Sequence, residues 1–320
     1  MGVSIKFSDT LENKLDRFKM LFEGASVSEI PNESSIENNL ARNRNLTTEQ
    51  IDILYDHENE VGIKKVNKDT LAEYPKLTDE QFTRFFNDTD VDKDYLARNP
   101  NLTPEQIDLL YQTRGVDKDF LAKYPKLTDE QFTRFFNDGW VDKDWFASNS
   151  NLTEEQIDII YETEGADKDL LAQFSKLTDE QFTRFFNDSD VVKNSLARNR
   201  NLTPEQIDLL YETGGVDKDF LAKFPKLTNK QFARFFNSLQ MSRDKNYLAA
   251  NPNLTPKQID ALYSPLYNEI LARYSKLTDE QFTRFFNDPV VDKNNLALNP
   301  SINPETVADN YPSGVINWKW

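Results

Sequence analysis

One stretch of eighteen residues, LAKYPKLTDEQFTRFFND at positions 121–138, returns almost unchanged along the chain. Further copies end at Asp88, Asp188 and Asp288, and a diverged copy ends at Ser238, so the copies are 50 residues apart. A stretch that returns at a fixed period is typical of stacked structural units, each of which buries its apolar face against its neighbours. We therefore predict a repeat array rather than one compact core.

The stretch contains the signals of a short amphipathic helix. Thr128 and Gln131 form a capping box, in which two backbone N–H groups find side-chain partners. Phe132, Phe135 and Phe136 follow at i, i+3 and i+4 and define one apolar face. The capping position recurs at Thr47, Thr78, Thr103, Thr128, Thr153, Thr178, Thr203, Thr228, Thr255, Thr278 and Asn303. Two such positions fall in each full period, so the basic unit is half a period long.

Each unit is predicted to contain a second short helix, which begins near the V-D-K-D segment with Asp117 as its N-cap. Neither helix is long enough to be stable alone, so both must stack on neighbouring units. Two unit types alternate: one reads LARNPNLTPEQIDLLY at residues 96–111, and the other is the Phe-rich stretch. Alternating aliphatic and aromatic layers are expected to interdigitate and to fix the register.

These patterns predict an all-α solenoid of about ten two-helix repeats, with a repeat domain at residues 39–305. Residues 1–38 are predicted to form a cap helix and loop that cover the first unit, with a partner-docking helix as the alternative. Residues 306–320 form a short apolar tail. This tail, with Trp318 and Trp320, is either a lid on the last unit or a docking peptide.

The motif L-A-x-N-P-N-L-T-P-E-Q, at a period near 25, resembles the leucine-rich repeat variant class of α-solenoids and, more loosely, HEAT-like helical repeats. The resemblance covers roughly residues 38–305. It implies stacked short helices, one set of which can be 3₁₀, wound into a right-handed superhelix. The Phe-rich units replace Asn-Pro-Asn by Tyr-Pro-Lys or Phe-Pro-Lys, a departure that bears on handedness and curvature. The resemblance indicates little about function, because such folds have many unrelated roles.

Composition excludes several classes of protein. The net charge is −16 with a pI near 4.6, so direct binding to nucleic acid is not expected, because a phosphate-backbone binder needs a basic footprint. No apolar run approaches the ~18 residues that a membrane-spanning helix needs. The N-terminal residues MGVSIKFSDTLENK lack the apolar region of a signal peptide, so we expect a cytoplasmic protein, with a virion as the alternative location.

No catalytic or metal-binding constellation is visible in the sequence. The chain has no Cys and one His, His57, so it offers no thiolate, no zinc spacing and no obvious base for a Ser nucleophile. Asp117 and Asp119 have counterparts in nearly every unit, and such repetition favours a capping role over general acid catalysis. The Asp-Lys-Asp segment also lacks the Gly and Glu of a calcium loop. We therefore expect a protein that is not an enzyme and holds no cofactor or metal.

One ladder of basic residues is a candidate partner surface. It consists of Arg84, Arg134, Arg184, Arg234 and Arg284, at a strict spacing of 50 residues. These side chains could offer a basic stripe to an acidic partner or to a nucleic-acid strand. The favoured interpretation is a solvated face on which Arg134, for example, pairs with Glu130 one helical turn earlier.

Ile53, Leu109, Ile159, Leu209 and Ala261 occupy the same position in the other unit type. We expect them to be buried between adjacent helices. The alternative is an exposed apolar stripe that meets a partner or a second copy of the chain.

Trp140, Trp145 and Phe146 depart from the repeat consensus in the middle of the array. Such an aromatic cluster is a candidate binding hot spot. Packing explains Trp145 nearly as well, because Tyr95 and Phe120 make the equivalent position aromatic elsewhere.

Three functions stay open. The leading one is a scaffold that binds a protein partner of unknown identity along an extended surface. The second is a structural component of a larger assembly, such as a virus particle or appendage, with self-association as a possibility. The third is an acidic decoy that mimics nucleic acid, although the Arg ladder would interrupt a continuous double row of carboxylates.

Overall fold

The computed structural model describes residues 41–56 except 43 and 45, residues 67–237 and 245–292, and residues 295, 296, 299, 301 and 302. Within these residues all regular secondary structure is helical, which confirms the predicted all-α class. The predicted N-terminal cap, the tail with Trp318 and Trp320, and His57 lie outside the described residues.

The described helices alternate between two sets along the chain. One set is α3 (Thr48–Asp56), α5 (Asp79–Asn87), α7 (Pro104–Gln112), α9 (Asp129–Phe136), α11 (Glu154–Tyr161), α13 (Asp179–Asn187), α15 (Pro204–Glu212), α17 (Asn229–Asn237), α19 (Pro256–Leu262) and α21 (Asp279–Phe286). The other set is α4 (Lys68–Glu73), α6 (Lys93–Ala97), α8 (Lys118–Lys123), α10 (Lys143–Ala147), α12 (Lys168–Phe174), α14 (Lys193–Ala197), α16 (Lys218–Lys223), α18 (Lys245–Ala249) and α20 (Asn268–Tyr274).

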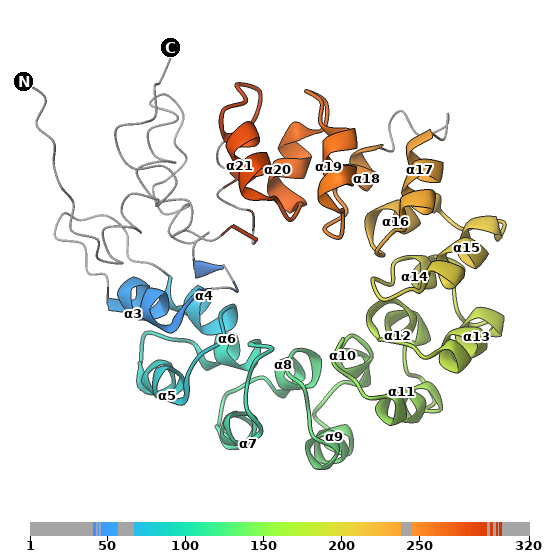
Figure 1. Cartoon of the computed structure of the whole chain (residues 1–320). Coiled ribbons are helices and arrows are strands. Elements are labelled where there is room, and N and C mark those ends of the chain that lie inside the picture. Colours follow the sequence, from blue (N-terminus) through green and yellow to red (C-terminus); the bar gives the residue numbers. More distant parts are fainter. Residues whose placement is uncertain are drawn as a thin grey trace, which may run out of the picture.

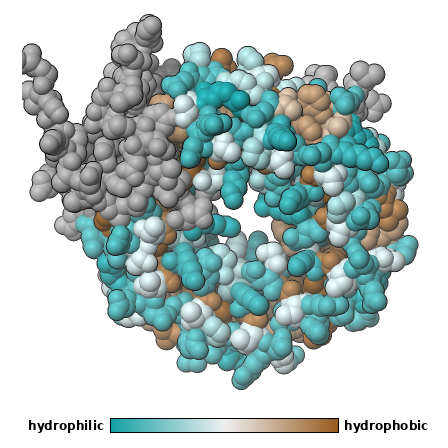
Figure 2. All heavy atoms as spheres, in the orientation of Figure 1, coloured by the Kyte–Doolittle hydropathy of each residue, from teal (hydrophilic) through white to brown (hydrophobic). Residues whose placement is uncertain are grey.

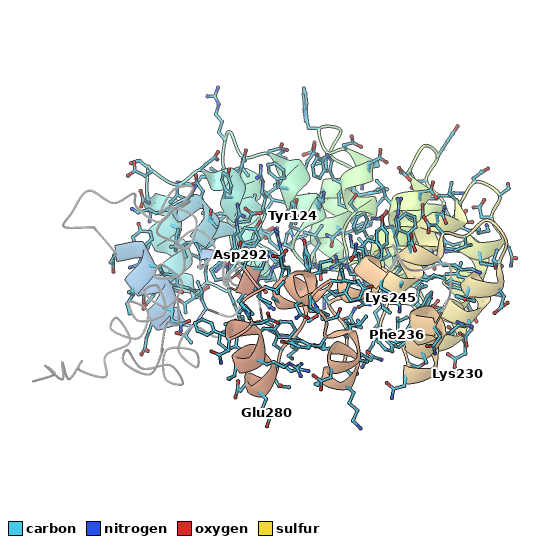
Figure 3. The ribbon with its side chains drawn as sticks, turned by 90° about the horizontal axis from the view of Figure 1, so that it is seen from above. Tyr124, Lys230, Phe236, Lys245, Glu280 and Asp292 are labelled. Atoms are coloured by element: carbon cyan, nitrogen blue, oxygen red, sulfur yellow. The ribbon has the colours of Figure 1, made fainter. Side chains whose placement is uncertain are left out.

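The helices stack into a curved two-layer array. From α4 to α17, the odd-numbered helices lie on the outside of an arc and the even-numbered helices lie on the inside (Figure 1). The arc leaves an opening at its centre (Figure 2). In the view from above, Glu280 in the first turn of α21 and Asp292 beyond its end lie towards opposite rims (Figure 3). The molecule is therefore a solenoid whose inner helices line a concave face.

Local capping explains where the helices begin, as the sequence predicted. The Thr128 hydroxyl oxygen accepts the N–H of Gln131, and the Gln131 side-chain oxygen accepts the N–H of Thr128, both at 3.2 Å. Pro104 begins α7, where its missing N–H has no intrahelical partner. The inner helix α8 begins at its predicted cap, because the Asp117 carboxylate accepts the N–H of Asp119 at 3.0 Å.

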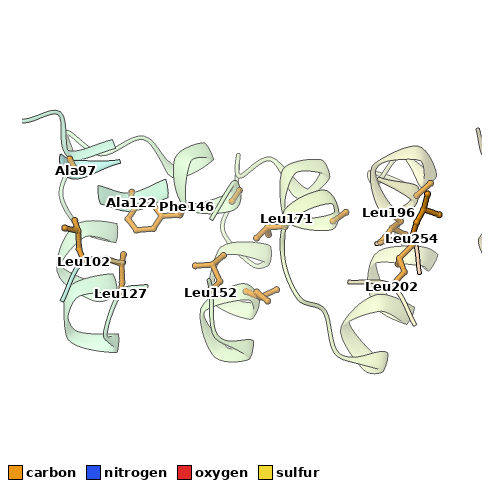
Figure 4. Close-up of a cluster of buried hydrophobic side chains, with 14 of the residues drawn as sticks. Ala97, Leu102, Ala122, Leu127, Phe146, Leu152, Leu171, Leu196, Leu202 and Leu254 are labelled. Carbon is orange, nitrogen blue, oxygen red and sulfur yellow. The ribbon is translucent and has the colours of Figure 1, made fainter. Parts of the chain in front are cut away.

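The apolar core lies between the two layers and continues from repeat to repeat (Figure 4). Leu110 of one unit type and Phe135 of the other occupy the same helix position, and both are fully buried. Leu121 and Ala122 face them from the inner layer and are also fully buried. The predicted alternation of aliphatic and aromatic core residues is thus present in the structure.

Buried amides connect each repeat to the one before it. The Gln131 amide nitrogen donates to the Pro104 carbonyl and to the Asp108 carboxylate, both at 2.8 Å. The Asn99 amide nitrogen donates to the carbonyls of Ala72 and Pro75 at 2.8 and 2.9 Å. These bonds fix the register of the stack, because each joins groups that belong to successive repeats.

Candidate binding surface on the concave face

The Arg ladder holds repeats together on the outer layer. The Arg234 guanidinium bonds the Asp208 carboxylate of the preceding outer helix at 2.6 Å and lies 3.7 Å from the centroid of the Tyr211 ring. Arg134 bonds Asp108 in the same way. The predicted pairing of Arg134 with Glu130 is therefore wrong. Stacking places a carboxylate of the preceding repeat closer to the guanidinium than the one in its own first turn.

The five ladder arginines share this arrangement. They are Arg84, Arg134, Arg184, Arg234 and Arg284, and each pairs with an aspartate and a tyrosine of the preceding outer helix. The ladder is therefore half-buried and electrostatically matched, rather than a row of unpaired cations.

A second cross-link joins three aliphatic units to the next Phe-rich unit, through the carboxylates of Asp88, Asp138 and Asp188. The Tyr161 hydroxyl donates to Asp188 at 2.6 Å, and the Lys168 ammonium bonds the same carboxylate oxygen at 3.0 Å. Burial, helped by this carboxylate, raises the pKa of Tyr161 to about 12. The hydrogen bond from the Tyr161 hydroxyl, with those from the Asp190 N–H and Lys168, holds the pKa of Asp188 well below its usual range. The Tyr161 and Asp188 side chains, whose pKa values are shifted, link neighbouring repeats and so stabilise the fold.

The equivalent carboxylate in the central repeat gives a pH-dependent prediction. Asp138 accepts bonds from the Tyr111 hydroxyl at 2.7 Å and the Lys118 ammonium at 2.9 Å, which lower its pKa. A lowered folded-state pKa stabilises the fold above the unfolded-state pKa of about 4 and loses this effect as pH falls through the folded value. Asp138→Asn should therefore cost about 1–3 kcal/mol at neutral pH. In urea unfolding curves, the gap from wild type should shrink below about pH 4, and a gap that is constant with pH would contradict this assignment.

The outer face of the arc carries an exposed apolar ladder. Leu109, Ile159 and Leu209 are 44, 48 and 47% exposed, and Ala261 is exposed, while Ile53 is half-buried. The expectation that these residues are buried between adjacent helices is wrong. Ile107 and Leu110 supply the buried face of α7, and Leu109 lies on the opposite side of that helix.

The three aromatic residues that break the consensus lie in three different environments. Trp140 is 89% exposed in the turn between α9 and α10. Trp145 is half-buried on α10, where its ring meets Phe120 of α8 edge to face at a centroid distance of 5.7 Å. Phe146 is fully buried in the core. Of the three, Trp145 lies on a surface that continues through neighbouring repeats.

That surface is the side of the inner helices opposite their fully buried residues, and its rings pack partly against the core. On α8, Leu121 and Ala122 point into the core, so Asp119, Phe120 and Lys123 lie on the opposite side of the helix. The same three positions on successive inner helices form three parallel rows along the inside of the arc. We call these rows together the concave strip.

The middle row is mostly aromatic or aliphatic. Its members are Tyr95, Phe120, Trp145, Leu170, Ser195, Phe220, Tyr247 and Ile270. All except the buried Ser195 are partly or largely exposed. Tyr124, the C-cap residue of α8, is labelled in Figure 3 and adds a half-buried ring beside this row.

The second row is basic beyond its first position, which is Glu73 on α4. Its cations are Arg98, Lys123, Arg198, Lys223 and Arg273, with Ser148, Gln173 and Ala250 at the intervening positions. Each cation lies over an aromatic ring: Arg98 is 4.0 Å from the Phe120 centroid, and Lys123 is 4.6 Å from that of Trp145. Within the described part of the chain, no ion pair engages these five side chains.

The third row is acidic and its carboxylates already have partners. Asp94 accepts the backbone N–H of Asp117 at 2.8 Å, and Asp119 accepts that of Asp142 at 3.0 Å, so each carboxylate bonds the next repeat. Burial raises the pKa of Asp119. The repeated Asp-Lys-Asp segment thus supplies first a cap and then a link between repeats.

A separate cleft of about 500 Å³ opens at the rim, lined by residues 161–169 and Asp190. It lies at one of the turns that connect an outer helix to the next inner helix, and most of its polar residues have counterparts in other repeats. Across the described ranges, no three His, Cys, Asp or Glu side chains are grouped to hold a metal ion. The concave strip is therefore the stronger candidate site.

Comparisons of the chain with protein-family models, with curated proteins and with solved structures gave no match. The fold and the strip define the chain as an α-helical repeat solenoid with a patterned concave face. None of its described helices has the length and apolar character to cross a lipid bilayer.

Proposed function

We propose that this protein is a non-enzymatic repeat scaffold that binds a polypeptide partner along the concave strip. The observation that carries the proposal is the middle row, in which most inner helices carry a partly exposed ring or aliphatic side chain on the concave face. These side chains also pack partly against the core, but a ring is not obligatory there, because Thr70 and Ser195 occupy the same position on α4 and α14 and are buried.

The geometry suits an extended partner. Neighbouring helices pack at about 8–10 Å, and an extended chain rises about 3.3 Å per residue, so about three partner residues span one repeat. Aromatic side chains are the usual anchors of protein interfaces because they bury a large area at low entropic cost. A row of such anchors would allow many modest contacts to act together.

The roles of the titratable groups support a function other than catalysis. The aspartates with lowered pKa values, such as Asp138 and Asp188, bond a tyrosine hydroxyl and a lysine of neighbouring repeats. The aspartates at the inner helices cap those helices or bond the next repeat. The same arrangement recurs along the array, whereas a catalytic group acts at one special place.

The exposed ladder of Leu109, Ile159 and Leu209 favours a second candidate function, a structural component of a larger assembly. A row of apolar residues on the convex face could meet neighbouring subunits while the concave strip holds a different partner. The acidic decoy ranks below both, because the ladder arginines neutralise carboxylates on the outer face.

Within the class of helical repeats, we propose a relation to the leucine-rich repeat variant or HEAT-like arrays. The L-A-x-N-P-N-L-T-P-E-Q motif supports it, since Asn99 of this motif ties one repeat to the previous one. We also propose that the protein acts inside the cell or within a particle assembled there.

The two tryptophans provide a matched test of the binding surface. Trp145→Ala should weaken partner binding by about 10–100-fold, because it removes a central anchor of the middle row. Trp140→Ala removes an equally large but almost fully exposed ring at the rim and should leave binding unchanged. We would use wild type and both variants as baits in extracts of the native source, with quantitative mass spectrometry of the bound proteins. A partner lost with Trp140→Ala but kept with Trp145→Ala would refute the concave assignment.

A further inference from the structure

We propose that the segment held by the concave strip is an acidic stretch of polypeptide, bound in an extended conformation with its carboxylates against the basic row. This inference rests on the proposed function and names the chemistry of the partner at the same surface.

The first support is the distribution of charge around the array. Ten short segments end at the capping threonines of the outer helices: 42–47, 73–78, 98–103, 123–128, 148–153, 173–178, 198–203, 223–228, 250–255 and 273–278. Together they contain thirteen basic residues and one acidic residue, in a chain that otherwise has more acidic than basic residues. The first turns of most outer helices, which begin where these segments end, are acidic, as at Asp129 and Glu130. Positive charge is thus concentrated on the segments that lead from each inner helix to the next outer helix.

The second support is that the cations of the basic row are available and already ordered. Arg98 and Arg198 each lie 4.0 Å from a phenylalanine ring of the next inner helix. Glu73 attracts Arg98 from the preceding inner helix without an ion pair, and among the described residues Arg198 has no ion pair either. A guanidinium held over a ring loses less side-chain entropy when an anion binds. The ladder arginines of the outer layer differ, because an aspartate neutralises each of them.

The third support is the acidic row, because its carboxylates favour an acidic peptide over a nucleic acid as the bound anion. Asp94 and Asp119 lie on the same concave face, about one helical turn from the basic row. A single-stranded nucleic acid has a charge at every nucleotide and would place phosphates near these carboxylates. An extended peptide can direct acidic side chains to one edge and apolar side chains to the rings. The arrangement of the three rows therefore favours a polypeptide over a nucleic acid.

The test uses the full chain and defined fluorescein-labelled probes in fluorescence anisotropy. The main probe is a peptide of about 20 residues, which at about 3.3 Å per residue passes about seven inner helices. It has Glu or Asp at every second position and Leu or Ser between them. A matched peptide replaces every Glu and Asp by Gln and Asn, and an oligothymidylate of similar length represents nucleic acid. We expect the acidic peptide to bind at least tenfold more tightly than either comparison probe.

A matched pair of triple variants locates the interaction. The first variant combines Arg98→Ser, Lys123→Gln and Arg198→Ser. The new residues are those that the chain itself has at the equivalent positions, Ser148 and Gln173. The combined variant should bind the acidic peptide about tenfold more weakly, because the loss of each exposed ion pair should weaken binding about two- to threefold. The control combines Arg114→Gln, Lys230→Gln and Lys257→Gln, which remove the same charge from exposed sites elsewhere and should change binding less than twofold.

The outcomes separate this inference from the proposed function. Equal binding of the acidic and amide peptides, with both lost in Trp145→Ala, would overturn the acidic partner and keep the concave scaffold. Tighter binding of oligothymidylate would replace polypeptide by nucleic acid. Acidic-peptide binding that resists both the concave triple variant and Trp145→Ala would overturn both proposals. Circular dichroism of each variant confirms that the fold is retained.

Discussion

Replacement of Phe135 by Ala should destabilise the array by about 3–5 kcal/mol, the usual cost of removing a fully buried phenylalanine. The ring lies parallel to that of Tyr111 in the preceding repeat, with a centroid distance of 4.2 Å. The substitution therefore weakens both its own repeat and the interface with the previous one. We would measure urea unfolding by far-ultraviolet circular dichroism.

The central position of Phe135 has a further consequence for cooperativity. In a repeat array, stability is close to a sum of repeat and nearest-neighbour terms, so a weak central interface can let two halves unfold separately. We expect a broadened or two-step transition, with hydrogen exchange fastest in α9 and its neighbours.

Two controls separate the lost ring from a general effect of mutation. Phe135→Leu copies Leu110 of the alternate unit and should cost about 1–1.5 kcal/mol, because most of the apolar volume remains. Leu109→Ala removes a half-exposed side chain and should cost under about 1 kcal/mol. Equal effects of Phe135→Ala and Leu109→Ala would show that the assigned core is wrong.

Replacement of Asn99 by Leu should cost about 3–5 kcal/mol, although leucine is apolar and similar in size, because it leaves buried backbone groups without partners. The Asn99 side chain donates to the carbonyls of Ala72 and Pro75 and accepts the N–H of Asn101 at 2.9 Å. Each backbone group orphaned in this buried site costs about 1–3 kcal/mol. Thermal melts and urea curves would measure the loss.

Asn101 provides the matched control in the same turn. Its side chain is exposed, so Asn101→Leu removes the same amide without orphaning a buried carbonyl. We expect a change within about 0.5 kcal/mol. If the two variants lost similar stability, the buried amide would not be the link between repeats that the structure assigns.

The candidate surface could be predicted from the sequence only in part. Trp145 stands out in the sequence because it departs from the consensus, yet the aromatic position it occupies recurs in most units and marks the whole middle row. Trp140, from the same cluster, lies at the rim, and Phe146 lies in the core. The regular spacing of Arg98 and Arg198 was an available signal for the basic row, but no sequence pattern alone shows that these side chains lie over rings and form no ion pair with the described residues.

The sequence by itself determined the period, the two alternating unit types and the start of nearly every described helix. These features depend on groups within about four residues of one another, such as Thr128 with Gln131 or Phe132 with Phe136. Only the tertiary structure decided the curvature of the arc, the exposure of Leu109 and the pairing of Arg134 with Asp108. The physical reason is that these depend on how successive repeats are packed, which brings together groups a full repeat apart in the chain and which no local pattern specifies.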